Sequence, residues 1–187
     1  PYRTVVDIAR TSAFRYALGY VDGLAREYGV EREELRAYAQ ANCRGLHGIA
    51  RAFDVFEHMD GRSDNGGESE ARAAMILAGV ATPELQVEIT RPGNAGYYLA
   101  DYGWQMPNGS WMLAELHGLG KFEDESQNDP EHTAAKTYRA ALMRDANLRA
   151  MGHNVIHFKL SDTYDVKTFG SMMRGYGIPT TKPYANS

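Results

Sequence analysis

The stretch Trp111-Met-Leu-Ala-Glu-Leu-His117 combines a hydrophobic run with a carboxylate near its end, and a glycine-rich, charged turn that contains Lys121 follows it. The apolar residues predict a buried strand. Side chains alternate along a strand, so Glu115 and His117 project to the same face. Because a desolvated carboxylate is costly unless it is paired, hydrogen-bonded or bound to a metal, Glu115 is the first candidate functional residue.

On both sides of this stretch, the spacing of the hydrophobic residues predicts a sheet with helices packed on it. Leu85, Val87 and Ile89 alternate with polar residues, which is typical of a half-buried strand. The remaining elements are expected in the order helix 68–78, strands 85–89, 97–102 and 111–116, helix 129–151, strand 154–160 and a short helix 166–173. Helices also fill the first 60 residues. The predicted fold class is therefore α/β (α+β), with a mixed sheet behind an all-helical section.

The turn-rich link Asp60-Gly-Arg-Ser-Asp-Asn-Gly-Gly67 is the predicted internal boundary. We expect a helical section over residues 1–62 and an α/β domain over residues 63–178. Residues 179–187, which contain Pro and Thr, are expected to form a loosely ordered tail.

Composition and charge narrow the class of protein. The chain has 187 residues, a formal net charge of −4 and one cysteine, Cys43, so a disulfide framework and a thiolate zinc cluster are excluded. No apolar stretch is long enough for a membrane span and no signal-like segment opens the sequence, which predicts a cytoplasmic protein without a membrane partner. Residues 61–129 carry 4 Lys or Arg against 11 Asp or Glu, whereas residues 130–187 carry 8 against 4. An acidic segment beside a basic one is expected of metal-dependent phosphodiester chemistry, although chance clustering of surface charge explains it as well.

Two predicted strands each end near a carboxylate. If the strands 97–102 and 111–116 pair as a hairpin, Asp101 and Glu115 meet at one end of the sheet. Their mutual repulsion is offset by a divalent cation, and their hard oxygen ligands suit Mg²⁺ or Mn²⁺. Lys121 or His117 would orient water or neutralise a developing oxyanion, and Glu68 would add an outer ligand. Simpler readings exist for each: Asp101 as a turn residue, Glu115 in a structural salt bridge, His117 as a turn histidine, Lys121 as a solvated lysine and Glu68 as a helix N-terminal residue.

Several runs in this order resemble a known family. They are Gly67-Glu-Ser-Glu-Ala-Arg72, Pro83-Glu-Leu-Gln-Val87, Leu99-Ala-Asp101, Ala114-Glu-Leu-His-Gly-Leu-Gly-Lys-Phe122, Arg144-Asp-Ala-Asn-Leu-Arg-Ala-Met-Gly152 and Asn154-Val-Ile-His-Phe158. Together they are similar to the very-short-patch-repair-like endonuclease family of the PD-(D/E)XK nuclease superfamily, over about residues 67 to 162. Arg3-Thr-Val-Val-Asp-Ile-Ala-Arg10 and the helices after it also resemble the segment before this domain in bacterial abortive-infection-type antitoxin-like proteins.

The resemblance implies roles for particular residues. Glu68 matches the helix glutamate, Asp101 the metal-binding aspartate, Glu115 the second carboxylate, Lys121 a basic position and Asp145 an acidic residue of the long helix. Where the family has Glu-x-Asp-Gly, this chain has Glu115-Leu-His-Gly118, so an imidazole replaces a ligand carboxylate. His153 and His157 lack the spacing of a metal motif.

The sequence thus predicts a Mg²⁺- or Mn²⁺-dependent DNA endonuclease, with Asp101 and Glu115 holding the metal. Basic residues of the long helix would contact the DNA backbone: Lys136, Arg139, Arg144 and Arg149. The alternative is a non-catalytic nuclease-fold module of a DNA-binding regulator or antitoxin, which net acidity and His117 favour. A third reading is an interaction domain that forms a homodimer through its helical section.

Overall fold

The computed structural model describes residues 2–117 and 130–182, except for the side chains of Asn94 and residues 130–137. It divides into two compact units, which we call the helical unit (Pro1–Thr82 with Asp162–Ser187) and the sheet unit (Pro83–Ser161). The predicted division into a helical section (1–62), an α/β domain (63–178) and a tail (179–187) stays a prediction. No helix of the described residues is long and apolar enough to cross a bilayer.

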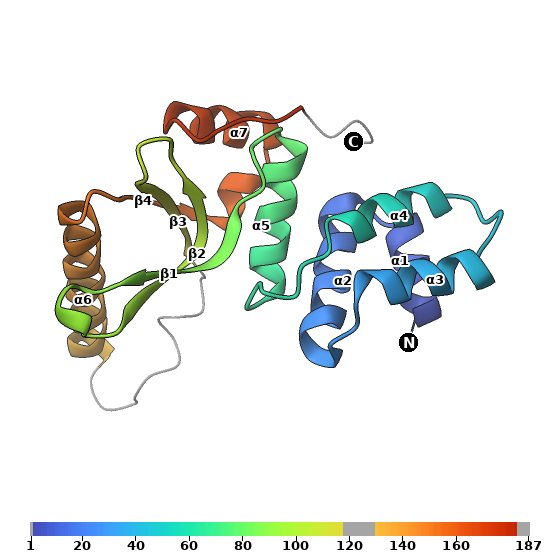
Figure 1. The fold of residues 1–187 in the computed structure, drawn as a ribbon, viewed down its shortest axis with the longest axis horizontal. Helices are drawn as coiled ribbons and strands as arrows, with labels where there is room; N and C mark the ends of the chain where they lie inside the picture. The colour runs from blue at the N-terminus through green and yellow to red at the C-terminus, as the bar shows by residue number, and fades with distance from the viewer. Residues whose placement is uncertain (1, 118–129, 183–187) are drawn as a thin grey trace. The chain divides into compact units, whose positions relative to one another are not determined.

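The helical unit contains six α-helices among its described residues (Figure 1). Their bounds are α1 Tyr2–Thr11, α2 Phe14–Tyr28, α3 Arg32–Asn42, α4 Ile49–Glu57, α5 Gly66–Leu77 and α7 Val166–Gly175. The boundary between the two units in the sequence falls within a 3-10 turn, η2 Leu160–Thr163. The helices expected within the first 60 residues and over 68–78 and 166–173 are therefore present.

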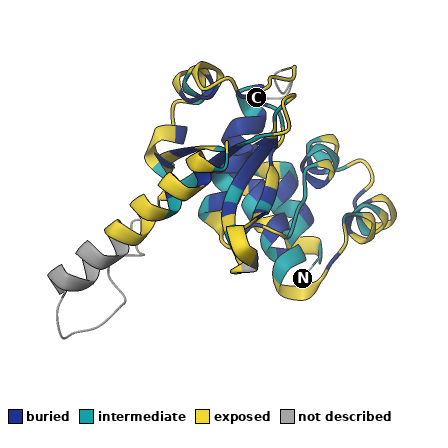
Figure 2. Cartoon of the chain, turned by 60° about the vertical axis from the view of Figure 1, so that its left-hand side comes forward, coloured by how far each residue is buried: buried dark blue, intermediate teal, exposed yellow. Residues whose placement is uncertain are grey.

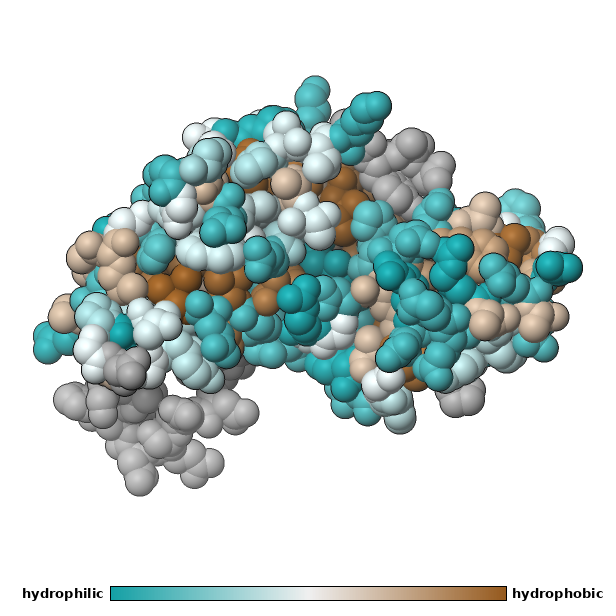
Figure 3. All heavy atoms as spheres, in the orientation of Figure 1, coloured by the Kyte–Doolittle hydropathy of each residue, from teal (hydrophilic) through white to brown (hydrophobic). Residues whose placement is uncertain are grey.

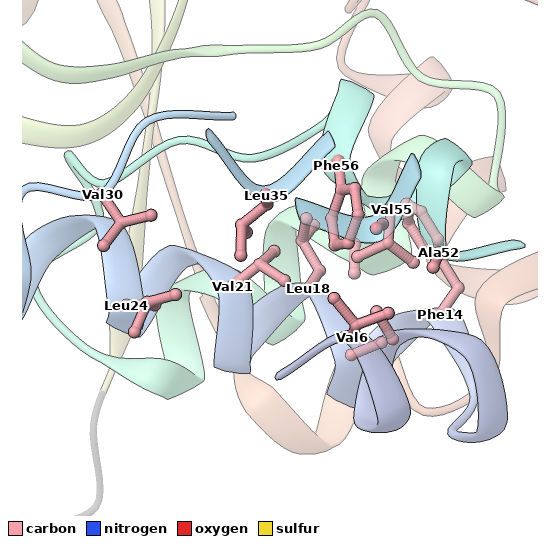
Figure 4. Packing of buried hydrophobic residues seen from close by; sticks show 14 of the residues in the cluster. Val6, Phe14, Leu18, Val21, Leu24, Val30, Leu35, Ala52, Val55 and Phe56 are labelled. Atoms are coloured by element: carbon pink, nitrogen blue, oxygen red, sulfur yellow. The ribbon is translucent and has the colours of Figure 1, made fainter. Parts of the chain in front are cut away.

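Apolar residues at helical spacing form the core of the helical unit (Figure 4). The central side chains, all with no exposed surface, are Val6, Leu18, Val21, Leu35, Val55 and Phe56. Helix α2 ends at Gly29, whose φ of 64° is a left-handed conformation that favours glycine. On the face shown in Figure 3, hydrophilic side chains cover most of the α1–α4 region, as expected when the apolar stripes face inward.

The C-terminal part of the helical unit is fixed by backbone contacts. Val80 and Thr180 form an antiparallel bridge, and the amide of Ala81 donates to the carbonyl of Pro179 at 2.9 Å. Helix α7 packs closely on the end of α5, since a Cβ at Gly170 would lie 2.8 Å from that of Ala78. Residues 179–181 of the expected tail thus take part in backbone pairing, and residues 183–187 lie outside the described residues.

The sheet unit is a four-stranded mixed sheet. Its elements are β1 Glu84–Thr90, η1 Pro92–Asn94, β2 Tyr97–Gln105, β3 Trp111–His117, α6 Pro130–Ala150 and β4 Asn154–Lys159. The strands lie in the order β1-β2-β3-β4; the first two pairings are antiparallel and β3 pairs with β4 in parallel. The predicted mixed α+β fold is confirmed, and α5, β1, β2, β3, α6 and β4 follow one another as expected. Membership of the PD-(D/E)XK superfamily stays a prediction.

One face of the sheet carries the long helix α6. Leu148 packs with Leu113 and Val155 in the core of this unit, whereas most described residues of α6 are exposed (Figure 2). The parallel pairing sets Leu113 opposite Val155, Glu115 opposite His157 and His117 opposite Lys159. Because alternate residues share a face, this register extends the hydrophobic face of β3 and β4 into a row of polar side chains.

Candidate functional site

The predicted pair of carboxylates lies on neighbouring strands. Pairing of Tyr102 with Ala114 brings Asp101, the preceding residue of β2, beside Glu115 of β3. The Oδ2 atom of Asp101 accepts a hydrogen bond of 2.8 Å from the amide of Leu116. The β1–β2 ladder skips the position where Gln86 would pair with Asp101, and Gln86 has a φ of 53°, which is uncommon for a residue with a side chain. The local distortion therefore lies opposite Asp101, one of the two predicted metal ligands.

Glu115 is held by an arginine of α6. Arg144 Nη1 donates to Glu115 Oε2 at 3.1 Å, and Nη2 donates to Oε1, so both carboxylate oxygens face the guanidinium. Nη2 also donates to the carbonyl of Leu99 at 2.6 Å. Burial raises the pKa of Glu115 and neighbouring Asp101 raises it further, whereas Arg144 acts in the opposite direction. The reading of Glu115 as a salt-bridged residue thus matches its observed contacts.

Two histidines extend the site along β3 and β4. The rings of His117 and His157 stack with centroids 4.8 Å apart and planes 23° apart. His157 Nε2 lies 2.7 Å from Asp145 Oδ2, while Asp145 Oδ1 is buried and has no hydrogen-bond partner among the described residues. Burial and the neighbouring His157 lower the pKa of His117. The site thus combines acidic and basic groups from four elements: β2, β3, β4 and α6.

The donor chemistry suits a hard cation. Asp101, Glu115 and the Leu99 carbonyl offer oxygen, and a cationic group, the Arg144 guanidinium, already bridges Glu115 and Leu99. In the described part of the chain no three His, Cys, Asp or Glu side chains converge so as to hold an ion. Mg²⁺ commonly binds through one or two carboxylates together with water and substrate phosphate, so Asp101 and Glu115 are enough protein ligands for such an ion. A cation on Glu115 would have to replace Arg144.

Glu68, the third predicted ligand, belongs to the helical unit, whereas Asp101 and Glu115 belong to the sheet unit. Its carboxylate accepts from the Asp64 amide and from Asn65 Nδ2, both at 2.7 Å, and its own amide donates to Asn65 Oδ1 at 3.0 Å. These contacts start helix α5 as an N-terminal cap does. The metal role of Glu68 stays a prediction beside this observed structural one.

The predicted basic residues have different environments. Lys121 lies outside the described residues, and so does the side chain of Lys136. Arg139 is exposed on α6, and Arg149 Nη2 lies 3.7 Å from Asp145 Oδ2. Arg144 contacts Glu115 and Leu99, and its contact with DNA stays a prediction.

Sequence reasoning did not assign His157 to the site and did not connect Arg144 with Glu115. The signal for His157 was its position between the apolar residues Ile156 and Phe158, as Glu115 lies between Ala114 and Leu116 on β3. Only the parallel register, however, places His157 and Glu115 opposite each other. Arg144 carried no local signal, because its position on α6 repeats the polar pattern of an exposed helix.

Comparison with known proteins finds relatives in Mycobacterium tuberculosis. "Uncharacterized protein MT2308" (strain CDC 1551 / Oshkosh) and "Uncharacterized protein Rv2248" (strain ATCC 25618 / H37Rv) are each 36% identical to this chain over 104 residues. The match covers 56% of this chain but only 38% of each relative. No family model matches the chain, and no solved structure matches it.

Proposed function

We propose that the chain is a metal-dependent DNA endonuclease domain of the PD-(D/E)XK type, which hydrolyses phosphodiester bonds. The observation that carries the proposal is the placement of Asp101 and Glu115 side by side on β2 and β3, with a cationic group held against Glu115. Two adjacent carboxylates repel each other and are tolerated where a cation offsets the repulsion. This arrangement is what Mg²⁺- or Mn²⁺-dependent phosphoryl chemistry requires of a protein.

Asp101 and Glu115 would hold the ion. When bound, such an ion supplies Lewis-acid stabilisation of the phosphoryl oxygens and an activated water. His117 projects to the same face as Glu115 and is exposed, so its imidazole is accessible to hydrogen-bond a water or a phosphate oxygen. Lys121 keeps its predicted role as a further cation near the phosphate. Arg139 and Arg149 on α6 would contact the DNA backbone, together with Lys136.

A second candidate function is a non-catalytic nuclease-fold module of a DNA-binding regulator or antitoxin. One observation favours it: both oxygens of Glu115 are already paired with Arg144, which satisfies the carboxylate without a metal. The imidazole of His117, where the resembled family has a carboxylate, and the net charge of −4 point in the same direction. Dimerisation through the helical section remains a separate prediction, which the mass in solution tests.

A plasmid-nicking assay separates the two functions. Supercoiled plasmid is incubated with the chain in Mg²⁺, in Mn²⁺ and in EDTA, and DNA binding is measured in parallel by gel shift. The endonuclease proposal expects nicking that depends on the metal and falls at least about 100-fold in Glu115→Ala and Asp101→Asn, the usual scale for loss of a charge-stabilising group. The matched control is Arg36→Gln, which removes a surface arginine in the helical unit that pairs with Glu57. Binding without nicking under all three conditions would support the module instead.

A further inference from the structure

The guanidinium of Arg144 is seated where a cation on Glu115 would lie. Its two terminal nitrogens bind both carboxylate oxygens of Glu115, and one of them also binds the Leu99 carbonyl. The Glu115 side chain is 15% exposed and the Arg144 side chain 26%, so neither is fully buried. Arg144 Nε is buried without a hydrogen-bond partner among the described residues, so the guanidinium is not fully satisfied where it sits.

We propose that Arg144 is a displaceable latch: it occupies the cation position of the site, and a divalent ion binds Glu115 only when Arg144 leaves. This inference rests on the proposed function. Mutual exclusion follows from geometry, because both Glu115 oxygens are engaged by the arginine and a second cation at the same oxygens would meet the guanidinium charge. An arginine that departs without replacement would leave Glu115 partly desolvated beside Asp101, so its departure is coupled to the arrival of an ion.

A displaced arginine needs a new anionic partner. Arg144 lies on α6, the helix that also exposes Arg139 and Arg149, and a nucleic-acid phosphate bound at this helix would supply such a partner. Arg–phosphate pairs are strong and bidentate, like the Arg–carboxylate pair that would be lost. Phosphate binding would therefore release Glu115 for the ion. Because coupling between two ligands is reciprocal, the ion would in turn strengthen binding of the phosphate backbone.

Cation binding can be measured without any cleavage. Mn²⁺ is titrated into the intact chain and followed by electron paramagnetic resonance of the unbound ion. We expect Arg144→Gln to bind Mn²⁺ about tenfold more tightly than the parent, within the usual range of coupling between sites. Arg144→Lys, which keeps the charge but binds Glu115 through a single point, is expected to fall between them. Arg36→Gln, which makes the same charge change at the surface, should leave the affinity unchanged.

The reciprocal arm uses a fluorescein-labelled DNA duplex and anisotropy, with Ca²⁺ as the hard cation. The parent should bind the duplex several-fold more tightly with Ca²⁺ than with EDTA, and Arg144→Gln should lose that dependence on Ca²⁺. The latch is overturned if Arg144→Gln and Arg144→Lys both bind Mn²⁺ no more tightly than the parent while circular dichroism shows both folded. If Arg144→Gln does not fold, the Arg144→Lys titration alone decides.

These results are distinguishable from failure of the proposed function. Tighter Mn²⁺ binding by the Arg144 variants in a chain that nicks no plasmid would support the latch and reject the endonuclease. If the parent nicks plasmid in a metal-dependent way but its Arg144 variants bind Mn²⁺ no more tightly, the endonuclease is supported and the latch is rejected.

Discussion

Each unit of the molecule contains a carboxylate paired with an arginine, and the two pairs differ in their exposure to solvent. In the helical unit, Arg72 Nη2 donates to both oxygens of Asp22, at 2.9 and 2.7 Å, and the Asp60 amide donates to the same carboxylate at 2.8 Å. These side chains are 0% and 3% exposed for Asp22 and Arg72, against 15% and 26% for Glu115 and Arg144. The Asp22–Arg72 pair links α2 to α5. The Glu115–Arg144 pair links β3 to α6 near the end of the strand.

The comparison indicates that a partly exposed ion pair leaves its carboxylate accessible to other partners, unlike a fully buried one. The Asp22 side chain has no exposed surface, and Arg72 and the Asp60 amide hydrogen-bond to its carboxylate. Glu115 has Asp101 beside it and stacked imidazoles next to it, so other partners are within reach of the same carboxylate. Three experiments can break or sharpen this contrast.

The largest effect is expected from removing the two arginines in turn. Arg72→Gln should destabilise the chain by about 3–5 kcal/mol, because it leaves the fully buried Asp22 carboxylate uncompensated. Arg144→Gln should cost about 1–3 kcal/mol, because Glu115 is nearer to solvent and keeps other hydrogen-bonding options. Urea unfolding measures both: Trp104 and Trp111, the two tryptophans of the chain, report on the sheet unit, and far-UV circular dichroism reports mainly on the helices. Equal losses at the two sites would erase the contrast.

A smaller effect is expected in the pH dependence of the sheet unit. The native pKa of Glu115 is raised above its ordinary value of 4.5, so between that value and the native pKa the folded chain binds a proton that the unfolded chain has released. Stability should therefore fall as the pH rises through this window. Glu115→Gln removes the titrating group and should flatten the corresponding part of the profile, measured as the tryptophan unfolding midpoint at a series of pH values. A parent midpoint that rises relative to the variant over the same window would show the opposite sign.

The smallest effect is expected at the surface pair of Arg36 and Glu57, whose side chains are 35% and 53% exposed. Arg36→Gln should change the unfolding free energy by less than about 1 kcal/mol, since exposed pairs gain little and salt screens them. The measurement is again urea unfolding, at low and at high salt. A loss comparable with that of Arg144→Gln would mean that the Glu115 pair behaves as an ordinary surface contact.

Much of the fold was accessible from the sequence, since helix and strand patterns are local. Leu85, Val87 and Ile89 lie in β1 as their alternation predicted. The neighbouring positions of Asp101 and Glu115 followed from a simple hairpin. Contacts between residues distant in sequence were harder to predict: the pairing of Arg144 with Glu115 was missed because an arginine on a polar helix carries no sign of the carboxylate that it binds.

The sequence by itself determined the kinds and order of the helices and strands, and which face of β3 would carry Glu115 and His117, because period and turn chemistry act over a few residues. The tertiary structure decided which charges meet. The parallel register of β3 and β4 sets His157 opposite Glu115, and the packing of Leu148 on the sheet brings Arg144 to Glu115 and Asp145 to His157. Such pairings depend on where whole elements come to rest, and no stretch of a few residues contains that information.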